Sequence, residues 1–386
     1  MNKNKLFLLD AYALIYRAYY AFIKFPRVDS KGRNTSAIFG FVNTLEEVLQ
    51  KQKPTHLAVA FDPDGPTFRH EQYEAYKAQR EATPEVIKAS VPIIKDILKA
   101  YNIPVLEVKG YEADDVIGTI AKQTDKSRFD VYMMTSDKDY GQLVEENVFI
   151  FRPKYGNNDY EVLNDQKVIE KYNLSHPHQV IDLLGLMGDA SDNIPGCPGV
   201  GEKTAVKLLD EFGSIENLLE NTDRLKGALK KKVEENREQI LFSKFLATIK
   251  IDVPIDVNAD DLIVRDKNEE AIKELFEDLE FRALLTRVLK VPEAPVKKGE
   301  PVQGDLFATV DAAGGPATLL DFNSDLQDIN TTPHTYTLIS TEKEMSALNK
   351  ILLAQTCVSF DTETTNTDPL RSELVGLSFA FKEGEA

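Results

Sequence analysis

A dense group of carboxylates between residues 110 and 140 is the strongest chemical signal in this chain. Three of these acids stand at the start of a predicted helix, and two follow a short apolar strand. Carboxylates this close together repel one another unless a cation lies among them, and a set of oxygen ligands favours Mg²⁺ or Mn²⁺ over zinc. The five acids are Glu112, Asp114, Asp115, Asp137 and Asp139.

Two more acids, Asp10 and Asp62, end apolar runs that are predicted to be strands, as Asp137 does. Strands that alternate with helices indicate a mostly parallel α/β sheet, in which ligands bind beyond the carboxyl ends of the strands. A single aspartate after a strand is usually a helix cap or a turn residue. Three of them beside the 110–140 group favour one shared metal site. The strands are predicted over residues 5–10, 55–62 and 131–137, with a helix over residues 35–51.

A third acidic pair, Asp189 and Asp192, follows an apolar helix in the run LMGDASDNIPG. The next segment, GCPGVGEKTAVKLL, resembles a helix-hairpin-helix, in which a glycine turn and backbone N–H groups at a helix start bind an anion. Such a motif contacts the phosphate backbone without reading bases. Its predicted contact residues are Gly199, Gly201, Lys203, Thr204 and Lys207.

The segment 66–80 mixes cations with aromatic residues at helical spacing. Charges suit phosphates and rings suit bases, so this face is predicted to bind a single strand of nucleic acid. The alternative is a solvated helix face whose cations pair with Glu71, Glu74 and Glu81. The residues of the predicted face are Arg69, Tyr73, Tyr76, Lys77 and Arg80.

The composition is that of a soluble globular protein, with 42% apolar and 28% charged residues. The net charge of −17 argues against nucleic acid only superficially, because residues 1–291 hold 40 Lys and Arg against 48 Asp and Glu. If nine of those acids are metal ligands, basic patches remain available elsewhere. The two cysteines, Cys197 and Cys357, form no disulfide framework and fit a reducing cytoplasm. No apolar run is long enough to span a membrane.

Changes in composition divide the chain. We expect an α/β core over residues 1–175, with an arch at about 66–90, and a helical DNA-binding region over residues 176–291. Residues 292–334 are rich in Pro, Gly, Ala and Asp and read as a linker. Residues 335–386 begin another α/β domain, with strands predicted over 335–340, at CVSFDTET and at LVGLSFAF, and with Thr341 capping a helix.

The first 290 residues resemble the 5′-nuclease domain of bacterial DNA polymerase I. The motifs that carry this resemblance run in order: LLD, YRAYYAF, FD, TFRHEQYEAYK, GYEADDVIGT, SDKDYGQLV, LMGDASDNIPG and GVGEKTA. Residues 335–386 resemble the start of the proofreading domain, in which Asp361 and Glu363 form an Asp-x-Glu motif. We expect that RNase H-like segment to be incomplete and inactive, and the polymerase domain to be absent. Gln303, Leu306 and Phe307 resemble the sliding-clamp-binding motif of bacterial replication proteins; a chance apolar pair is equally compatible with them.

The resemblance implies Mg²⁺-dependent hydrolysis of 5′ flaps and of RNA primers by two divalent ions, for which Mn²⁺ can substitute. It also implies that Arg17 contacts DNA, that Tyr76, Lys77 and Arg80 serve catalysis, and that the helix-hairpin-helix can hold K⁺. We expect a cytoplasmic monomer that acts on DNA with 5′ flaps or nicks. The implied metal ligands are Asp10, Asp62, Glu112, Asp114, Asp115, Asp137, Asp139, Asp189 and Asp192.

Two other functions remain open at this point. A PIN-type ribonuclease also has an acidic α/β site, although it would explain neither the arch-like segment nor the helix-hairpin-helix. A DNA-binding or clamp-tethering module without catalysis would explain those two features, but not the full set of nine acids. Cleavage of flap DNA, compared with single-stranded RNA, separates the three.

Overall fold

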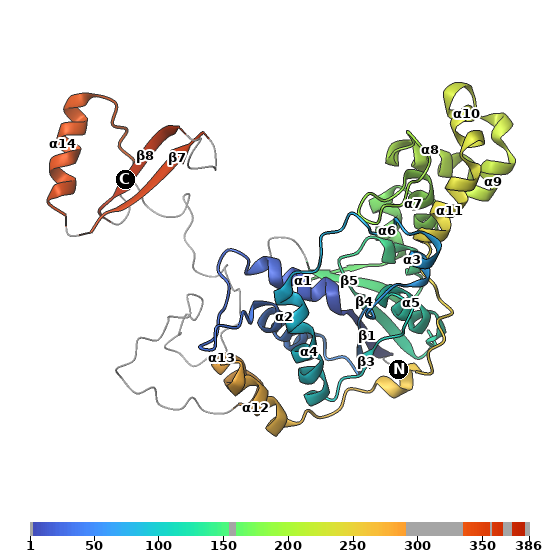
Figure 1. Ribbon diagram of the computed structural model, residues 1–386, viewed down its shortest axis with the longest axis horizontal. Helices are drawn as coiled ribbons and strands as arrows, with labels where there is room; N and C mark the ends of the chain where they lie inside the picture. Colours follow the sequence, from blue (N-terminus) through green and yellow to red (C-terminus); the bar gives the residue numbers. More distant parts are fainter. Residues whose placement is uncertain (1–2, 154–159, 291–334, 356, 366–372, 383–386) are drawn as a thin grey trace. The chain divides into compact units, whose positions relative to one another are not determined.

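The computed structural model describes residues 3–153, 160–290, 335–355, 357–365 and 373–382. The chain forms two compact units, Met1–Val302 and Gln303–Ala386 (Figure 1), and each is described by itself. Within the described residues, no helix is both long enough and apolar enough to cross a membrane.

The first unit is built on a six-stranded sheet with the order β3-β2-β1-β4-β5-β6. Neighbouring strands are parallel, except that β6 runs antiparallel to β5. The mostly parallel sheet predicted from the sequence is therefore confirmed. The strands are β1 (Asn4–Asp10), β2 (His56–Ala60), β3 (Val105–Leu106), β4 (Phe129–Met134), β5 (Val148–Pro153) and β6 (Tyr160–Leu163).

The register of the central strands explains why the acids meet. Leu9 of β1 pairs with Val59 of β2 on one side and with Met134 of β4 on the other. The three strands therefore end level with one another, and the residues that follow them emerge at one edge. The interior of β1 is almost completely buried, as expected for a parallel strand covered on both faces.

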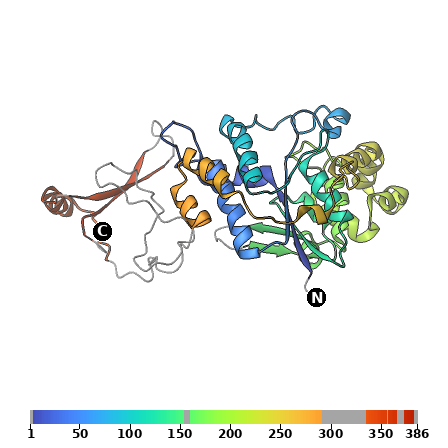
Figure 2. The same ribbon diagram turned by 90° about the horizontal axis from the view of Figure 1, so that it is seen from below.

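Helices cover both faces of this sheet (Figures 1 and 2). On one side lie α1 (Ala11–Ala21), α2 (Ser36–Glu47) with the short η1 (Val48–Gln52), and α4 (Glu85–Ala100). On the other side α5 (Ala113–Gln123) contacts β1, β2 and β4. Helix α12 (Glu269–Asp278) packs against α4 and is followed by α13 (Arg282–Leu289). The helix predicted over residues 35–51 corresponds to α2 and η1.

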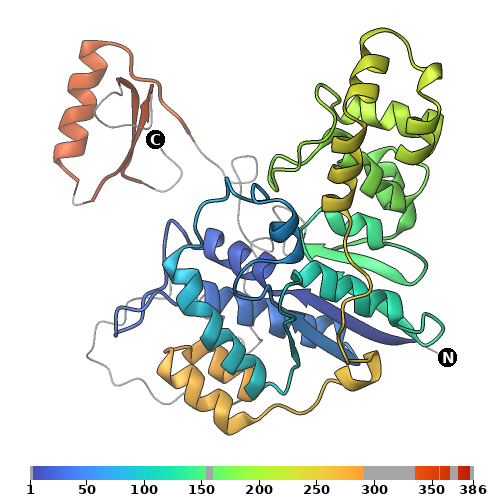
Figure 3. The same ribbon diagram turned by 45° about the vertical axis from the view of Figure 1, so that its right-hand side comes forward.

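A second group of helices rises beyond one end of the sheet (Figure 3). Helix α7 packs against α11 and α8, and Gly185 permits a close approach, since a Cβ there would lie 2.8 Å from Ile215 Cδ1 and 3.0 Å from Lys244 Cβ. The group comprises α7 (Val180–Met187), α8 (Glu202–Phe212), α9 (Ile215–Glu220), α10 (Gly227–Glu235) and α11 (Arg237–Ala247), and α6 (Asp165–Tyr172) precedes it.

The second unit contains α14 (Glu342–Leu353) and the antiparallel pair β7 (Ser359–Thr364) and β8 (Leu374–Ala380). Thr341 caps α14 by accepting a hydrogen bond from the Glu344 backbone N–H at 3.3 Å, so the predicted cap is confirmed. The strand predicted over residues 335–340 is wrong, because this segment is irregular apart from one bridge at its first residue.

Candidate metal centre

The acids that follow the central strands are held at the sheet edge by short local contacts. Asp10 accepts hydrogen bonds from the Ala13 backbone N–H at 3.1 Å, as the cap of α1, and from Thr135 Oγ1 at 3.1 Å. Asp62 accepts from the Ala113 backbone N–H at 2.7 Å and so lies against the start of α5. Asp137 accepts from the Asp139 backbone N–H at 2.9 Å. The loops after β1, β2 and β4 thus aim their acids at the same place.

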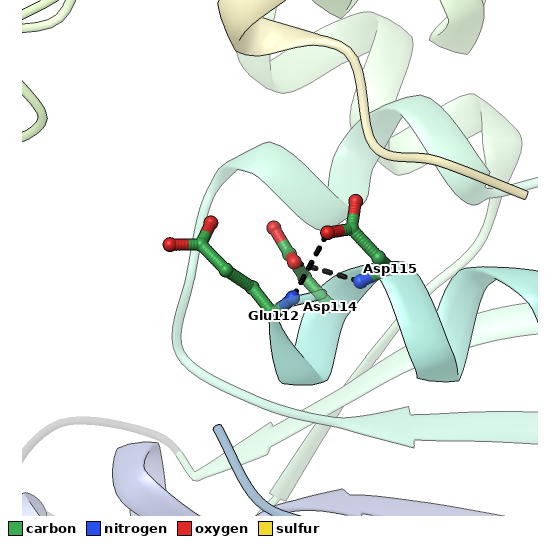
Figure 4. A group of neighbouring side chains, drawn as sticks. All are labelled: Glu112, Asp114 and Asp115. Atoms are coloured by element: carbon green, nitrogen blue, oxygen red, sulfur yellow. Dashed lines mark hydrogen bonds between the residues drawn. The ribbon is translucent and has the colours of Figure 1, made fainter. Parts of the chain in front are cut away.

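The first turn of α5 contributes a compact triad of acids (Figure 4). Glu112, Asp114 and Asp115 each offer one oxygen within a group whose atoms lie no more than 4.8 Å apart. Glu112 and Asp115 form a capping box, in which the Glu112 backbone N–H donates to Asp115 Oδ2 at 3.0 Å. The Asp115 backbone N–H donates to Asp114 Oδ1 at 2.7 Å. Acids at a helix start are electrostatically favoured there, which helps this turn to tolerate three of them.

The pair Asp189 and Asp192 lies on the loop between α7 and α8. An isolated bridge between Asp189 and Ile194 closes this loop through backbone hydrogen bonds of 2.9 and 2.8 Å. Asp189 accepts from the Ser191 backbone N–H at 2.8 Å and pairs with Lys138 Nζ at 2.9 Å. Because Lys138 stands between Asp137 and Asp139, this ion pair joins the α7–α8 loop to the acids after β4.

Two side chains of the segment 66–80 join the α5 triad to the α7–α8 loop, and a third pairs with that loop alone. Tyr76 donates its hydroxyl to Glu112 Oε2 at 3.0 Å and to Asp192 Oδ2 at 3.2 Å. Lys77 Nζ lies 2.7 Å from Glu112 Oε1 and 3.6 Å from Asp192 Oδ2, and Arg80 pairs with Asp192. Two acids 80 residues apart in sequence are therefore held by the same tyrosine and the same lysine.

The backbone of this segment differs from the predicted helix. Only α3 (Phe68–Gln72) is helical, and turns follow it over residues 74–79, so the predicted continuous helical face is wrong. The helix ends before Tyr73, whose backbone is extended, and in the turns that follow Lys77 takes a left-handed conformation, with φ of 55°, and donates its N–H to the Asp192 carbonyl at 3.0 Å. Asn193 Nδ2 donates to the Ala75 carbonyl at 2.6 Å. The backbone of this segment thus forms hydrogen bonds with the α7–α8 loop in place of the bonds that a continuous helix would make.

Two residues predicted to bind DNA are committed to contacts within the protein. Arg69 is 1% exposed, with its guanidinium buried against Glu112 and Asp115, so its assignment to a DNA-binding face is corrected. Tyr73 is half-buried and packs edge-on against Phe242, with ring centroids 5.5 Å apart. Tyr76 is buried, which fits the role of holding acids better than stacking on bases.

The local environments divide the acids into two classes by their pKa. Burial alone would raise the pKa of Glu112 and of Asp192, but neighbouring cations, Lys77 above all, outweigh it and lower both. Burial raises the pKa of Asp139 well above its usual range, and the charges of other acids add to the effect. Burial together with Asp62 raises the pKa of Asp10 to about 7. Glu112 and Asp192 thus form ion pairs, whereas Asp10, Asp114 and Asp139 form none among the described residues.

The acids whose pKa is raised form a suitable environment for a divalent cation. Asp139 Oδ1 is buried and has no hydrogen-bond partner among the described residues. Burial raises the pKa of Asp114 well above its usual range as well, and the charge of the neighbouring Asp115 adds to the effect. An oxygen-only donor set with an unsatisfied buried carboxylate is the environment that Mg²⁺ and Mn²⁺ prefer. These acids are therefore the best candidates in the described chain for holding such an ion.

The predicted helix-hairpin-helix turn presents an exposed surface. Gly199 has a φ of 74° and lies under the Lys232 ammonium, because a Cβ at Gly199 would be 2.3 Å from Lys232 Nζ. Gly201 caps α8, and Lys203 and Lys207 are exposed on that helix, with Thr204 half-buried. The first helix of the hairpin does not adjoin the turn as predicted, since α7 ends at Met187 and a bridged loop intervenes.

The remaining predicted site residues lie elsewhere. Arg17 is exposed on α1. Asp361 lies on β7 opposite Ser378 of β8, and Glu363 lies on the same strand. Gln303, Leu306 and Phe307 fall outside the described residues, so clamp binding stays a prediction from the sequence.

Several residues that orient the acids were not identified from the sequence. Thr135 donates to Asp10 and accepts from the Asp137 backbone N–H at 3.1 Å, thereby linking two acids. Ser191 donates its hydroxyl to Asp189 at 2.8 Å. Lys138 forms an ion pair with Asp189. Each of them lies within two residues of an acid, and this proximity was the only available signal.

Family models match the regions of the chain that carry this centre. Residues 5–173 match the family model described as 5′-3′ exonuclease, N-terminal resolvase-like domain, and residues 175–270 match the 5′-3′ exonuclease, C-terminal SAM fold. Residues 336–386 match the 3′-5′ exonuclease model. The acids after the strands and on α5 thus come from one family domain, and Asp189 and Asp192 from the next.

Two solved structures of bacteriophage T5 proteins share the fold. One is described as T5 5′-exonuclease with bound divalent metal ions (zinc), with a TM-score of 0.54 at 22% identity over 71% of this chain and 99% of that chain. The other is T5 D15 flap endonuclease in a pseudo-enzyme-product complex with DNA and metal ions, with a TM-score of 0.54 at 21% identity over 72% and 100%.

Curated relatives agree with the family models. DNA polymerase I of Bacillus subtilis is 45% identical over 289 residues, which are 74% of this chain and 32% of that protein. DNA polymerase I of Pseudomonas aeruginosa is 36% identical over 399 residues, which are 100% of this chain and 40% of that protein. The chain spans about a third of the length of the first of these relatives. In sequence order, the chain matches both 5′-3′ exonuclease models and then the 3′-5′ exonuclease model, and over these regions it is similar to DNA polymerase I of several bacteria.

Proposed function

We propose that this chain is a divalent-metal-dependent 5′-nuclease that hydrolyses phosphodiester bonds at 5′ flaps and RNA primers, leaving nicks that can be ligated during replication and repair. One observation carries this proposal. Acids from two family domains converge on the sheet edge, and Tyr76 and Lys77 bind Glu112 and Asp192 together. A site that exists only when both domains are docked suits a substrate that contacts both.

The chemistry follows from the donor set. Two Mg²⁺ ions, or Mn²⁺ in their place, would supply an activated water and charge stabilisation at the scissile phosphate. The acids that form no ion pair among the described residues, Asp10, Asp114 and Asp139, are the first candidates to hold them. Lys77 pairs with Glu112 and Arg80 pairs with Asp192, and both cations are candidates to balance charge that builds up on the phosphate. The acids named above account for hydrolysis without a Ser, Cys or His nucleophile.

Substrate binding draws on exposed positive and backbone groups away from the acids. The turn at Gly199 and Gly201 offers N–H groups at the start of α8, and Lys203 and Lys207 add charge. This surface suits the phosphate backbone of duplex DNA, with K⁺ as a candidate bridging ion. Arg17 on α1 is a further candidate contact.

The deciding experiment is cleavage of a 5′-flap DNA duplex by this chain, with Mg²⁺ or with EDTA. We expect flap release with Mg²⁺ and none with EDTA, and we expect Asp137→Asn and Asp139→Asn to abolish release. The surface variant Lys88→Met serves as the control and should cleave normally. Preference for single-stranded RNA over flap DNA would instead favour a PIN-type ribonuclease. Flap binding without cleavage under any metal condition would favour a DNA-binding module.

Three further parts of the proposal concern the whole protein. We propose a monomer that works in the cytoplasm, where its two free cysteines stay reduced. We also propose that residues 303–307 tether it to a sliding clamp. Alanine at both Leu306 and Phe307 should abolish clamp binding while flap cleavage without the clamp continues, and binding that persists in this variant would refute the tether.

A further inference from the structure

Arg69 makes an unusually complete set of hydrogen bonds for a cation inside a protein. Its Nε donates to the Leu246 carbonyl at 2.9 Å, and its Nη2 donates to the Thr248 carbonyl at 2.8 Å. Its Nη1 and Nη2 each donate to Asp115 at 2.8 Å, and Nη1 also donates to Glu112 at 3.1 Å. All five N–H groups of the guanidinium are used, so Arg69 has no donor left for a substrate phosphate.

These contacts join the two family domains at the metal centre. Arg69 and Asp115 belong to the N-terminal domain, whereas Leu246 and Thr248 lie at the end of α11, in the C-terminal domain. The backbone N–H of Lys250, two residues further on, donates to Asp115 Oδ1 at 2.8 Å. The first turn of α5 is thus fastened to the residues after α11 through one buried ion pair.

Asp115 differs from Asp114 beside it. Asp115 is completely buried, and its two oxygens accept four N–H groups: two from Arg69, one from Glu112 and one from Lys250. Asp114 is half-buried, and among the described residues it accepts one hydrogen bond, from the Asp115 backbone N–H to its Oδ1 (Figure 4). Of the two neighbours, Asp114 has an oxygen free for a metal ion, whereas binding a metal at Asp115 would require breaking existing bonds.

We propose that Arg69 and Asp115 form a buried positioning pair, which orients Glu112 and Asp114 for a divalent ion and holds the residues after α11 against them, and that Asp115 is not itself a metal ligand. This inference rests on the proposed metal-dependent function. It separates the nine acids into ligands and one anchor. It also assigns Arg69, which was predicted to contact DNA with the rest of segment 66–80, to the interior of the site.

The change in Mn²⁺ affinity when Arg69 is removed distinguishes a positioning role from simple electrostatic repulsion. A cation beside an acidic site repels a metal ion, so removing it should strengthen metal binding if charge alone mattered. Loss of a group that orients metal ligands instead weakens binding, typically by about 10- to 100-fold. Arg69→Met should therefore weaken Mn²⁺ binding by that factor. Arg80→Met, which removes a half-exposed cation from the same site, should leave Mn²⁺ binding unchanged or strengthen it.

The experiment is Mn²⁺ titration calorimetry on the whole chain without DNA. Arg69→Lys keeps the charge but loses the planar fork, and it should weaken Mn²⁺ binding nearly as much as Arg69→Met. Asp115→Asn should weaken binding in the wild-type background and add nothing in Arg69→Met, because the two residues act as one unit. A further loss of about tenfold in the double variant would make Asp115 a direct ligand and overturn the proposal.

Folding is checked separately. Hydrogen exchange of the backbone amide of Lys250 should become faster in Asp115→Asn than in Asp114→Asn, because only the first variant disturbs its acceptor. Exchange that is unchanged in Asp115→Asn would also overturn the proposal. If wild type neither binds Mn²⁺ nor cleaves a flap, the proposed function fails. If wild type does both and Arg69→Met binds Mn²⁺ as tightly, only the positioning pair fails.

Discussion

Lys77 offers a direct test of how the acidic centre is stabilised. Its ammonium lies 2.7 Å from Glu112 and 3.6 Å from Asp192, and the three side chains are 19%, 7% and 11% exposed. At an effective dielectric constant of about 20, these distances correspond to gross attractions of about 6 and about 5 kcal/mol. Desolvation offsets most of this energy. Removing one partner of a buried pair costs about 3–5 kcal/mol, because the other charge stays buried and unpaired.

We therefore expect Lys77→Met to lower the free energy of unfolding by about 3 kcal/mol in EDTA, the lower end of that range, since part of Lys77 reaches solvent. Saturating Mg²⁺ should reduce the loss to less than about 1 kcal/mol, because a divalent ion can take over the neutralisation of the same carboxylates. The assay is urea unfolding of wild type and variant, with EDTA and with Mg²⁺, followed by circular dichroism.

The matched control is Lys88→Met. Lys88 pairs with Glu85 at 2.7 Å, but the two side chains are 52% and 86% exposed, so this pair should contribute no more than about 0.5 kcal/mol in either condition. Equal losses for Lys77→Met in EDTA and in Mg²⁺ would mean that Lys77 only packs. No loss in EDTA would mean that the acids are not compensated by this lysine. Either result refutes the electrostatic explanation.

Three further predictions concern other parts of the first unit. Tyr76→Phe removes two hydrogen bonds to buried carboxylates and should lower stability by about 1–3 kcal/mol in urea unfolding. The pKa of Asp10 is about 7 when folded and about 3.9 when unfolded, so between these values the folded state keeps a proton that the unfolded state has lost. Stability in EDTA should therefore fall as pH rises from about 4 to about 7, by at most about 4 kcal/mol from this group, and Asp10→Asn should flatten the slope in unfolding curves taken across that range. Gly185→Ala places a Cβ 2.8 Å from the side chain of Ile215 and should lower the melting temperature through about 1–3 kcal/mol of overpacking.

The central strands β1, β2 and β4 could be predicted because two patterns coincide there: apolar runs, and acids that follow them. Each central strand is an apolar run, as is typical of buried parallel strands, and each has an acid at its end or within three residues after it. The six-residue strand β5 was not predicted; β3 and β6 were not predicted either, since β3 is two residues long and β6 is an edge strand of four. Neither has enough residues to show a period.

The predicted acids and the predicted cations differ in how well the sequence located them. The position of an acid at the end of a strand follows from the strand itself, so the site position of Asp10 could be predicted from the residues next to it. Segment 66–80 has good helical spacing, yet its conformation is decided by the α7–α8 loop, more than 110 residues away, through bonds such as Lys77 N–H to the Asp192 carbonyl. Helical periodicity cannot report a partner so distant, and that is why Arg69 and Tyr76 were assigned to a surface.

The cations of segment 66–80 differ in burial, and this difference gives the segment two functions. Arg69 is enclosed and fully bonded, so it is a permanent part of the acidic centre. Lys77 and Arg80 keep 19% and 51% of their side chains exposed, and their partners are among the proposed metal ligands. A metal ion that binds Glu112 or Asp192 competes with them directly. Lys77 and Arg80 would then be free to turn toward an incoming phosphate, while Arg69 keeps the first turn of α5 in place.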